Sequence, residues 1–210
     1  MHHDMILAFD MDDTLCNTHN EVYKRTLHYC LNNFLLEESV WLTENPFVHF
    51  SDYTGDLKQI VLKEVIEKRE YMNEAQPSEL LRNLVGVLDG ARVHFGNSIK
   101  IVICTHRGDN IEAWMSTYNY LKKHGLENKF DMIHSIDHEI NKDKLGYLEK
   151  MYPSSRILLI DDNPFGSKNE VRGFDSRVLM YNEVTSYKCH MNQAAYLNHI
   201  DLLSRICSYN

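Results

Sequence analysis

The chain has 210 residues and a formal net charge of −8, and its 43% hydrophobic and 25% charged residues are ordinary proportions for a globular protein. It has no apolar run near the roughly 20 residues of a membrane span and no basic-then-apolar N-terminus, so we expect neither a membrane anchor nor a signal peptide. The acidic balance argues against a broad duplex nucleic-acid-binding face, which needs basic side chains.

The five cysteines are far apart and form no C-x-x-C pair. They stand at positions Cys16, Cys30, Cys104, Cys189 and Cys207. This spacing excludes a zinc ribbon and argues against a disulfide framework. We therefore expect a protein of a reducing compartment, the cytoplasm.

Short, nearly continuous apolar runs predict buried strands, and amphipathic patterns between them predict helices. The strands are expected at residues 5–9, 99–104, 130–134, 156–160 and 177–181. The helices are expected at residues 78–95, 109–124, 143–151 and about 191–207. Alternation of this kind predicts an α/β fold with a Rossmann-like parallel sheet covered on both faces.

Residues 17–76 break this alternation, because they contain no good strand run. Helical patterns at 20–36 and 57–72 flank a looser aromatic segment. That segment contains Trp41, Phe47, Phe50 and Tyr53. We expect a small helical insertion at 17–76, after the first strand, and an α/β core made of 1–16 and 77–210. The aromatic side chains would either form the core of the insertion or stack on a nucleotide base.

Polar residues follow the predicted strands, where ligands of such sheets bind. They are Asp10, Asp12 and Asp13 after the first strand, Thr105, His106 and Arg107 after the second, and Asp161 and Asp162 after the fourth. Lys142 and Lys144 precede a helix between the third and fourth strands. Carboxylates brought together repel one another unless a cation compensates, and Mg²⁺ prefers such oxygen ligands while keeping waters for a phosphate. The pattern favours a small phosphorylated substrate over other partners.

The segment DMDDT, from Asp10 to Thr14, resembles the D-x-D-x-T signature of the haloacid dehalogenase superfamily of phosphohydrolases. Thr105 is similar to its second motif, Lys142 to its third, and the pair Asp161 and Asp162 to its fourth. The resemblance covers essentially the whole chain. It implies a Mg²⁺-dependent phosphomonoester hydrolase that acts through an aspartyl-phosphate, with the insertion as a cap that reads the leaving group.

The resemblance also implies roles for individual residues. Asp10 would be the nucleophile and a metal ligand, and Asp12 the general acid and base, with its backbone carbonyl on the metal. Thr105 and Lys142 would contact the phosphoryl group. Asp162 would bind Mg²⁺ directly, and Asp161 either directly or through water. Lys144 is the alternative to Lys142, which we prefer because it lies three residues before Leu145, the first apolar residue of the next helix.

Among capped members, the chain is similar to the 5′(3′)-deoxyribonucleotidase group, which implies a nucleoside monophosphate or deoxynucleotide substrate. Those nucleotidases usually have Gly and Val where this chain has Asp13 and Thr14. Thr105, His106 and Arg107 also resemble the phosphatase module of polynucleotide kinase-phosphatases, so we expect His106 and Arg107 to bind substrate. A polynucleotide 3′-phosphatase, another small-metabolite phosphatase and an inactive Mg²⁺- or phosphate-binding module are the alternatives.

Two further patterns have weaker interpretations. Cys16 follows the first motif closely, and we expect a buried thiol there in preference to a second nucleophile. His134 and His138 have the four-residue spacing of a zinc site on a helix. They follow a strand, so we do not expect them to bind zinc together.

Overall fold

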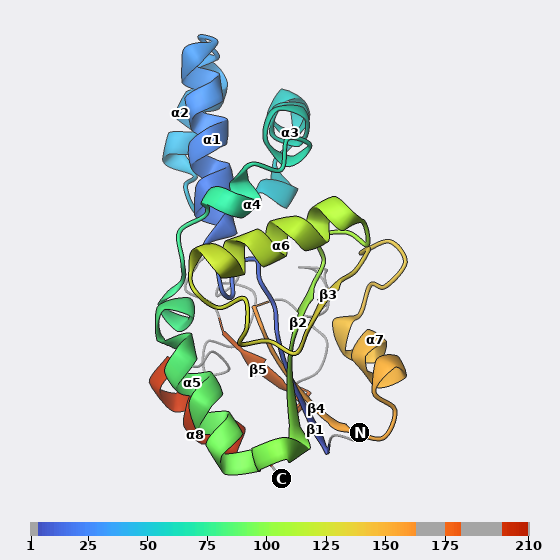
Figure 1. Ribbon diagram of the computed structural model, residues 1–210. Coiled ribbons are helices and arrows are strands. Elements are labelled where there is room, and N and C mark those ends of the chain that lie inside the picture. The colour runs from blue at the N-terminus through green and yellow to red at the C-terminus, as the bar shows by residue number, and fades with distance from the viewer. Residues whose placement is uncertain (1–3, 163–174, 182–198, 210) are drawn as a thin grey trace.

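The computed structural model describes residues 4–162, 175–181 and 199–209. The strands among these residues form one five-stranded parallel sheet with the order β3-β2-β1-β4-β5 (Figure 1). The strands are β1 (Met5–Phe9), β2 (Ile99–Thr105), β3 (Met132–Ser135), β4 (Arg156–Asp161) and β5 (Val178–Met180). Each overlaps a strand expected from the sequence, and the predicted Rossmann-like α/β fold is confirmed.

Strand β1 lies at the centre of the sheet and is buried on both faces. Met5, Leu7 and Phe9 belong to one hydrophobic cluster, and Ile6 and Ala8 belong to another. The first cluster includes side chains of α5 (Glu79–Phe95), α6 (Ile111–Lys123) and α8 (His199–Cys207). The second includes side chains of α7 (Lys144–Met151). This two-sided burial is the reason that the strands appear in the sequence as unbroken apolar runs.

Helices α5 and α8 lie side by side on one face of the sheet (Figure 1). A Cβ placed on Gly90 of α5 would lie 3.0 Å from a methyl carbon of Leu203 in α8, so the two helices approach closely there. The helices expected at 78–95, 109–124 and 143–151 are confirmed. Of the last predicted helix, residues 199–207 are helical and residues 191–198 lie outside the described part of the chain.

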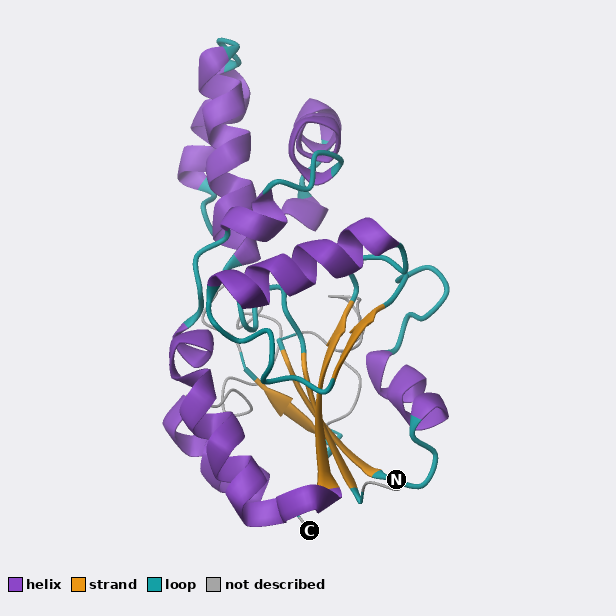
Figure 2. Cartoon of the chain, in the orientation of Figure 1, coloured by secondary structure: helices purple, strands orange, loops and turns teal. Residues whose placement is uncertain are grey.

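The insertion is helical and projects beyond the carboxyl edge of the sheet (Figure 2). Its elements are α1 (Thr18–Asn32), α2 (Leu36–Glu44), η1 (Phe50–Asp52), α3 (Gly55–Ile60), η2 (Val61–Ile66, a π-helix) and α4 (Tyr71–Glu74). We call the segment from Thr18 to Glu74 the cap. It has its own hydrophobic cluster. Arg25 of α1 forms an ion pair with Glu21 of the same helix and ion pairs with Glu70 and Glu74 that join α1 to α4.

The cap departs from the sequence-based expectation in two places. The predicted helix at 20–36 ends at Asn32, because Phe34 has a φ of 57° and a new helix, α2, then begins. The predicted helix at 57–72 consists of three pieces, and Arg69, with a φ of 56°, separates η2 from α4. Left-handed backbone at a residue other than glycine cannot continue an α-helix, and apolar periodicity alone does not reveal it.

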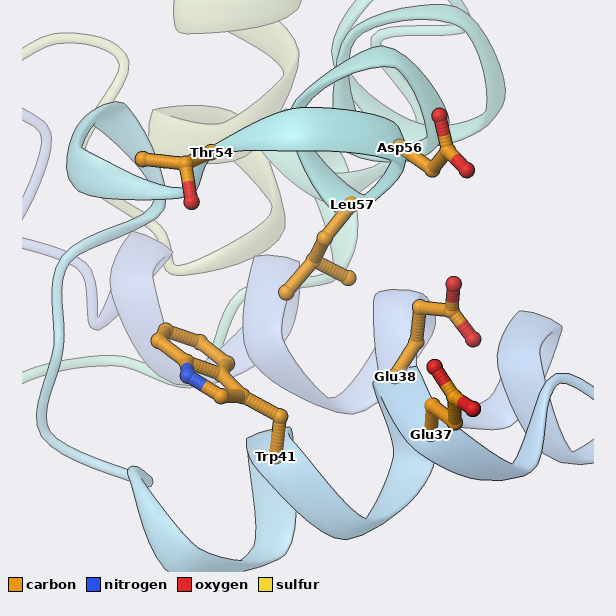
Figure 3. Close-up of a pocket in the computed structure, with 6 residues that line it drawn as sticks. All are labelled: Glu37, Glu38, Trp41, Thr54, Asp56 and Leu57. Carbon is orange, nitrogen blue, oxygen red and sulfur yellow. The ribbon is translucent and has the colours of Figure 1, made fainter.

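The aromatic residues of the insertion have different environments. In Figure 3, Trp41 and Leu57 point toward each other in a small open pocket of about 240 Å³ on the cap. The Tyr53 ring packs edge-on against Trp41 at 5.5 Å between centroids, whereas Phe47 is 64% exposed. Trp41 and Tyr53 therefore form part of the cap's own core, and Phe50 alone of these four lines the cavity described below.

No helix in the described ranges combines the length and the apolar character that crossing a bilayer requires.

Candidate active site

Strand register brings the polar residues of the sequence together at one edge of the sheet. Phe9 pairs with Ile103 of β2 and with Ile160 of β4, so the next residue, Asp10, lies beside the ends of both neighbouring strands. The Asp10 amide donates a hydrogen bond of 2.9 Å to the Ile160 carbonyl, which continues the pairing one residue further. Asp161 is the residue of β4 that stands next to Asp10.

Asp10, Asp161 and Asp162 form a compact cluster of carboxylates. All three are at most 5% exposed, and one oxygen from each lies within 4.8 Å of the others. Burial raises the pKa of Asp10 to about 7; Lys144 opposes this shift, and the carboxylates of Asp161 and Asp12 add to it. Burial, with the neighbouring Asp161, also raises the pKa of Asp162 well above its usual range. An added divalent cation would relieve this repulsion, and the oxygen donors suit a hard ion such as Mg²⁺.

Lys144 is the buried cation of the cluster. Its Nζ lies 2.8 Å from Asp10 Oδ1 and 2.8 Å from Asp161 Oδ2. Burial opposes the charge of Lys144, but the two carboxylates prevail and raise its pKa above the usual value.

Lys142, which the sequence analysis preferred, is exposed. The reason is local: the Asp143 side chain accepts a hydrogen bond of 3.0 Å from the Leu145 amide and caps α7. Lys144 is therefore the first residue of the helix, at the sheet edge, and it replaces Lys142 in the assignments that follow.

Thr14 orients Asp162. The Thr14 hydroxyl donates to Asp162 Oδ1 at 3.2 Å and accepts from the Asp162 amide at 3.0 Å. Both residues are buried, so this pair ties the loop after β1 to the end of β4. We predicted no role of its own for Thr14 from the sequence, although its place in the D-x-D-x-T pattern was a signal that could have suggested one.

Thr105 ends β2 and lines the same cavity as Asp10. Its hydroxyl is buried and has no hydrogen-bond partner among the described residues. Thr105 does not cap the following helix, because the Asn110 side chain accepts from the Ala113 amide and caps α6. A buried hydroxyl without a partner is costly, and an oxygen atom of a bound ligand would satisfy it.

Asp12 is held by two side chains from other elements. Arg107 Nε and Nη2 donate to Asp12 Oδ2 and Oδ1 at 2.9 and 2.7 Å, and the Thr18 hydroxyl donates to Oδ1 at 2.6 Å. Burial opposes ionisation of Asp12, but the Arg107 guanidinium prevails and holds its pKa below the usual value. The Arg107 side chain is inaccessible to solvent and lies behind Asp12, so in this structure it contacts Asp12 and does not line the cavity.

Asp13 joins the same loop to the cap. Its Oδ1 accepts a hydrogen bond of 2.8 Å from the His19 amide, and its Oδ2 lies 3.9 Å from His49 Nε2. The imidazole rings of His19 and His49 are stacked at 5.4 Å between centroids. These contacts depend on tertiary structure, and we predicted no role for either histidine from the sequence.

A cavity of about 410 Å³ lies between the sheet edge and the cap. On the sheet side it is lined by Asp10, Asp12, Asp13, Thr105, His106, His138, Lys144 and Asp162, and on the cap side by Thr18, His49, Phe50, Ser51, Tyr71 and Met72. His106, which we predicted to bind substrate, therefore lines the cavity. The predicted catalytic residues Asp10, Asp12 and Thr105 line it too. Volumes of this order accommodate small organic ligands.

The structure also shows the environments of Cys16 and of the pair His134 and His138. Burial raises the pKa of the Cys16 thiol far above its usual value, with only partial relief from Arg107, and Sγ donates to the Met11 carbonyl at 3.2 Å. A neutral thiol in that environment is not a nucleophile. His134 is bonded to the Tyr147 and Tyr152 hydroxyls inside the core, whereas His138 lies at the cavity.

No protein-family description and no curated protein sequence matches this chain. Solved structures do match. The chain is similar to a protein from Clostridium acetobutylicum described as a predicted phosphatase, with a TM-score of 0.59 and 14% identity, over 98% of this chain and 99% of that one. It is also similar to a haloacid dehalogenase-like family hydrolase from Streptococcus pneumoniae, with a TM-score of 0.54 and 14% identity, over 95% and 96%. The chain thus shares its fold with these two proteins over nearly its whole length.

Proposed function

We propose that this protein is a Mg²⁺-dependent phosphomonoester hydrolase that acts through an aspartyl-phosphate. The observation that carries the proposal is the position of Asp10, between the Lys144 ammonium at 2.8 Å and the carboxylates of Asp161 and Asp162. A nucleophile that attacks a phosphoryl group needs positive charge beside it, because both partners are anionic. The names of the two similar structures, a phosphatase and a hydrolase, agree with this chemistry.

The cation would be held by Asp10, by Asp162 and by the backbone carbonyl of Asp12. Asp162 is favoured over Asp161 as the direct ligand, because Asp161 Oδ2 already accepts from Lys144, whereas Thr14 orients Asp162. When bound, Mg²⁺ supplies positive charge that offsets the carboxylates and the phosphoryl oxygens.

In the first step, an oxygen of Asp10 forms a bond to phosphorus while the bond from phosphorus to the leaving oxygen breaks. Asp12 takes part in its protonated form, which it must reach against the effect of Arg107 on its pKa, and gives this proton to the departing alcohol. Lys144 and the Thr105 hydroxyl hold the phosphoryl oxygens. In the second step, a water molecule attacks the phosphorus and passes a proton to Asp12. Phosphate leaves, and the Asp10 carboxylate is restored.

The substrate that we favour is a nucleoside monophosphate or deoxynucleotide. The resemblance of the sequence motifs to the deoxyribonucleotidase group supports it. The cavity adds support, since Phe50 and Tyr71 offer aromatic surfaces on which a base could stack.

A panel of phosphate monoesters with purified protein and Mg²⁺ tests the proposal. It should contain a generic aryl phosphate, 5′- and 3′-nucleotides, sugar phosphates and a 3′-phosphorylated oligonucleotide. We expect turnover of the aryl phosphate and the nucleotides, complete loss in Asp10→Asn, and a Mg²⁺-dependent beryllium fluoride adduct on Asp10 in the unmodified protein. If the protein forms no adduct and hydrolyses no ester, the inactive-module alternative replaces this proposal. Hydrolysis of sugar phosphates alone would refute the nucleotide assignment.

A further inference from the structure

The His106 side chain lines the cavity, and its imidazole has one nitrogen held by a hydrogen bond and one that can accept. His106 Nε2 lies 2.7 Å from the Asn141 carbonyl, and since a carbonyl only accepts, Nε2 carries the hydrogen. Burial, with the nearby Lys144 charge, lowers the pKa of His106 to about 3, so the ring is neutral. Its other nitrogen, Nδ1, is therefore an unprotonated acceptor. In the described part of the chain no donor to Nδ1 is present.

The orientation of this ring is set on two sides. The hydrogen bond to Asn141 fixes one edge, and the His138 ring packs against it edge-on, at 4.9 Å between centroids and an interplanar angle of 83°. His106 also follows Thr105 directly, and both line the same cavity as Asp10, the proposed nucleophile. A ligand atom bonded to Nδ1 would belong to the leaving group, close to the scissile bond.

The cap supplies the opposite wall of the cavity with side chains that include no carboxylate, lysine or arginine. Thr18, His49, Phe50, Ser51, Tyr71 and Met72 line it there. The Phe50 ring packs on His49 at 4.1 Å between centroids, so its position is also fixed. Such a wall suits an uncharged leaving group with a flat or apolar surface.

The charges that line the cavity disfavour a second anionic group on the substrate. The carboxylates of Asp10, Asp12, Asp13 and Asp162 face it. Among the described residues, the cationic side chains nearby are already paired, Lys144 with Asp10 and Asp161, and Arg107 with Asp12. The described lining contains no further lysine or arginine. An additional phosphate or carboxylate on the leaving group would therefore lie near the carboxylates of Asp12 and Asp13 and meet no uncommitted lysine or arginine among the described lining residues, an arrangement that disfavours binding.

From these features we infer that the site selects phosphate monoesters whose leaving alcohol is uncharged and carries a second hydroxyl near the ester, and that His106 accepts a hydrogen bond from this hydroxyl. The inference rests on the proposed phosphatase activity and narrows its substrate class. Nucleosides and simple polyols meet the requirement. Bisphosphates, phosphorylated acids and the 3′-phosphate end of a polynucleotide, which carries a phosphodiester close by, do not.

Matched substrates test the inference on the unmodified protein. A 2′-deoxynucleoside 5′-monophosphate is compared with its 2′,3′-dideoxy analogue, which lacks the hydroxyl, and with its 3′,5′-bisphosphate, which adds charge. Glycerol 1-phosphate is compared with 3-phosphoglycerate in the same way. We expect kcat/KM to fall by about 10-fold or more without the hydroxyl and by about 100-fold or more with the added anion. Equal kcat/KM within either kind of pair, or efficient turnover of a 3′-phosphorylated dinucleotide, would overturn the inference.

Hydrolysis of p-nitrophenyl phosphate separates this inference from the proposed function. If the aryl ester is hydrolysed but the pairs show no preference, the phosphatase proposal stands and the inference fails. If no ester is hydrolysed with Mg²⁺ present, the phosphatase proposal fails and the inference fails with it.

Two variants then assign the hydroxyl preference to His106. His106→Phe keeps a flat ring but removes the acceptor, and His106→Asn keeps an amide oxygen near the position of Nδ1. The measured quantity is the ratio of kcat/KM for the hydroxylated substrate to that for its dideoxy analogue. We expect the ratio to fall below about 2 in His106→Phe and to stay above about 5 in His106→Asn. An unchanged ratio in His106→Phe would show that another residue reads the hydroxyl.

Discussion

Arg107 and Asp12 form a bidentate ion pair between residues 95 positions apart, with the guanidinium inaccessible to solvent and the carboxylate 30% exposed. The pair fixes the carboxylate that we assign to proton transfer. It also makes Asp12 the main counter-charge of a buried cation. A substitution at Asp12 therefore has a structural effect as well as a catalytic one.

We predict that Asp12→Ala lowers the free energy of unfolding by about 2–4 kcal/mol, slightly less than for a fully buried pair, because Asp12 is partly exposed. The cause is the unpaired Arg107 that remains. The double variant Asp12→Ala with Arg107→Met should recover a large part of this loss, as measured by urea denaturation. A double variant less stable than Asp12→Ala would show that the guanidinium charge is not the source of the destabilisation.

Lys144 and Lys142 provide a matched pair two residues apart. Lys144→Ala should lower kcat by about 10²–10³-fold, the usual effect of removing a group that stabilises transition-state charge. Lys142→Ala removes an exposed ammonium, and its kcat and KM should stay within about twofold of the unmodified protein. Steady-state kinetics on an aryl phosphate distinguishes the two. The reverse ranking would restore Lys142 to the assignment that the sequence suggested.

Mg²⁺ should stabilise the folded protein, because it relieves repulsion among Asp10, Asp161 and Asp162. At a concentration about 100 times its dissociation constant, the gain would be about 2.7 kcal/mol, seen as a rise in Tm. Asp162→Asn should reduce the rise. Asp89→Asn is the control, since Asp89 is exposed and pairs with Lys129. Equal Mg²⁺-dependent rises in both variants would move the metal away from Asp162.

His134 predicts a pH dependence of stability. Burial, with Lys100 nearby, lowers its pKa from the ordinary 6.5 to about 4 in the folded protein. Between these values the unfolded chain binds the extra proton and the folded chain does not, so stability falls as the pH is lowered from about 6.5 toward 4. The loss should reach about 1–3 kcal/mol. His134→Gln, which does not titrate, should flatten this part of the curve in urea titrations. His106 titrates in the unmodified protein and in the variant alike, so it does not affect the comparison. If stability depends on pH with the same slope in both, His134 contributes nothing to that dependence.

Two glycines of α5 should respond oppositely to alanine. A methyl group at Gly86 would meet only open space, so Gly86→Ala should stabilise the protein by about 0.5–1 kcal/mol through helix propensity. At Gly90 the new methyl would lie 3.0 Å from Leu203, and the resulting clash should remove this gain and cost about 1–3 kcal/mol. Thermal unfolding measures both. Equal stabilisation by the two substitutions would show that α8 shifts freely on α5.

The strands and the acidic residues could be predicted from the sequence because both depend on local patterns. The strand runs are apolar on nearly every residue, as burial on both faces requires, and Asp10 and Asp161 follow from where the runs end. The choice between Lys142 and Lys144 was different. It depended on whether Asp143 caps the helix, and the distance to Leu145 does not contain that information.

The remaining features depend on tertiary contacts between distant segments. Nothing near Arg107 in the sequence indicates that its partner is Asp12, and nothing near His49 indicates that it approaches Asp13. The left-handed backbone at Phe34 and Arg69 also escaped the prediction, since neither residue is a glycine or an asparagine. Apolar periodicity therefore predicted a helical cap but not its division into short helices.

The two-sided burial of β1 also affects how the chain finds its alignment. In a strand with one solvent-exposed face, a register shift of one residue would expose the apolar side chains to water. The cost of that exposure fixes the pairing register. In β1 every residue is apolar, so a shifted pairing with β4 would still bury apolar groups on both faces. The polar contacts at the edge, from the Asp10 amide to Ile160 and from Thr14 to Asp162, discriminate between alignments. The residues that we assign to chemistry thus also select the correct strand pairing, and substitutions there can produce misaligned sheets as well as loss of the proposed activity.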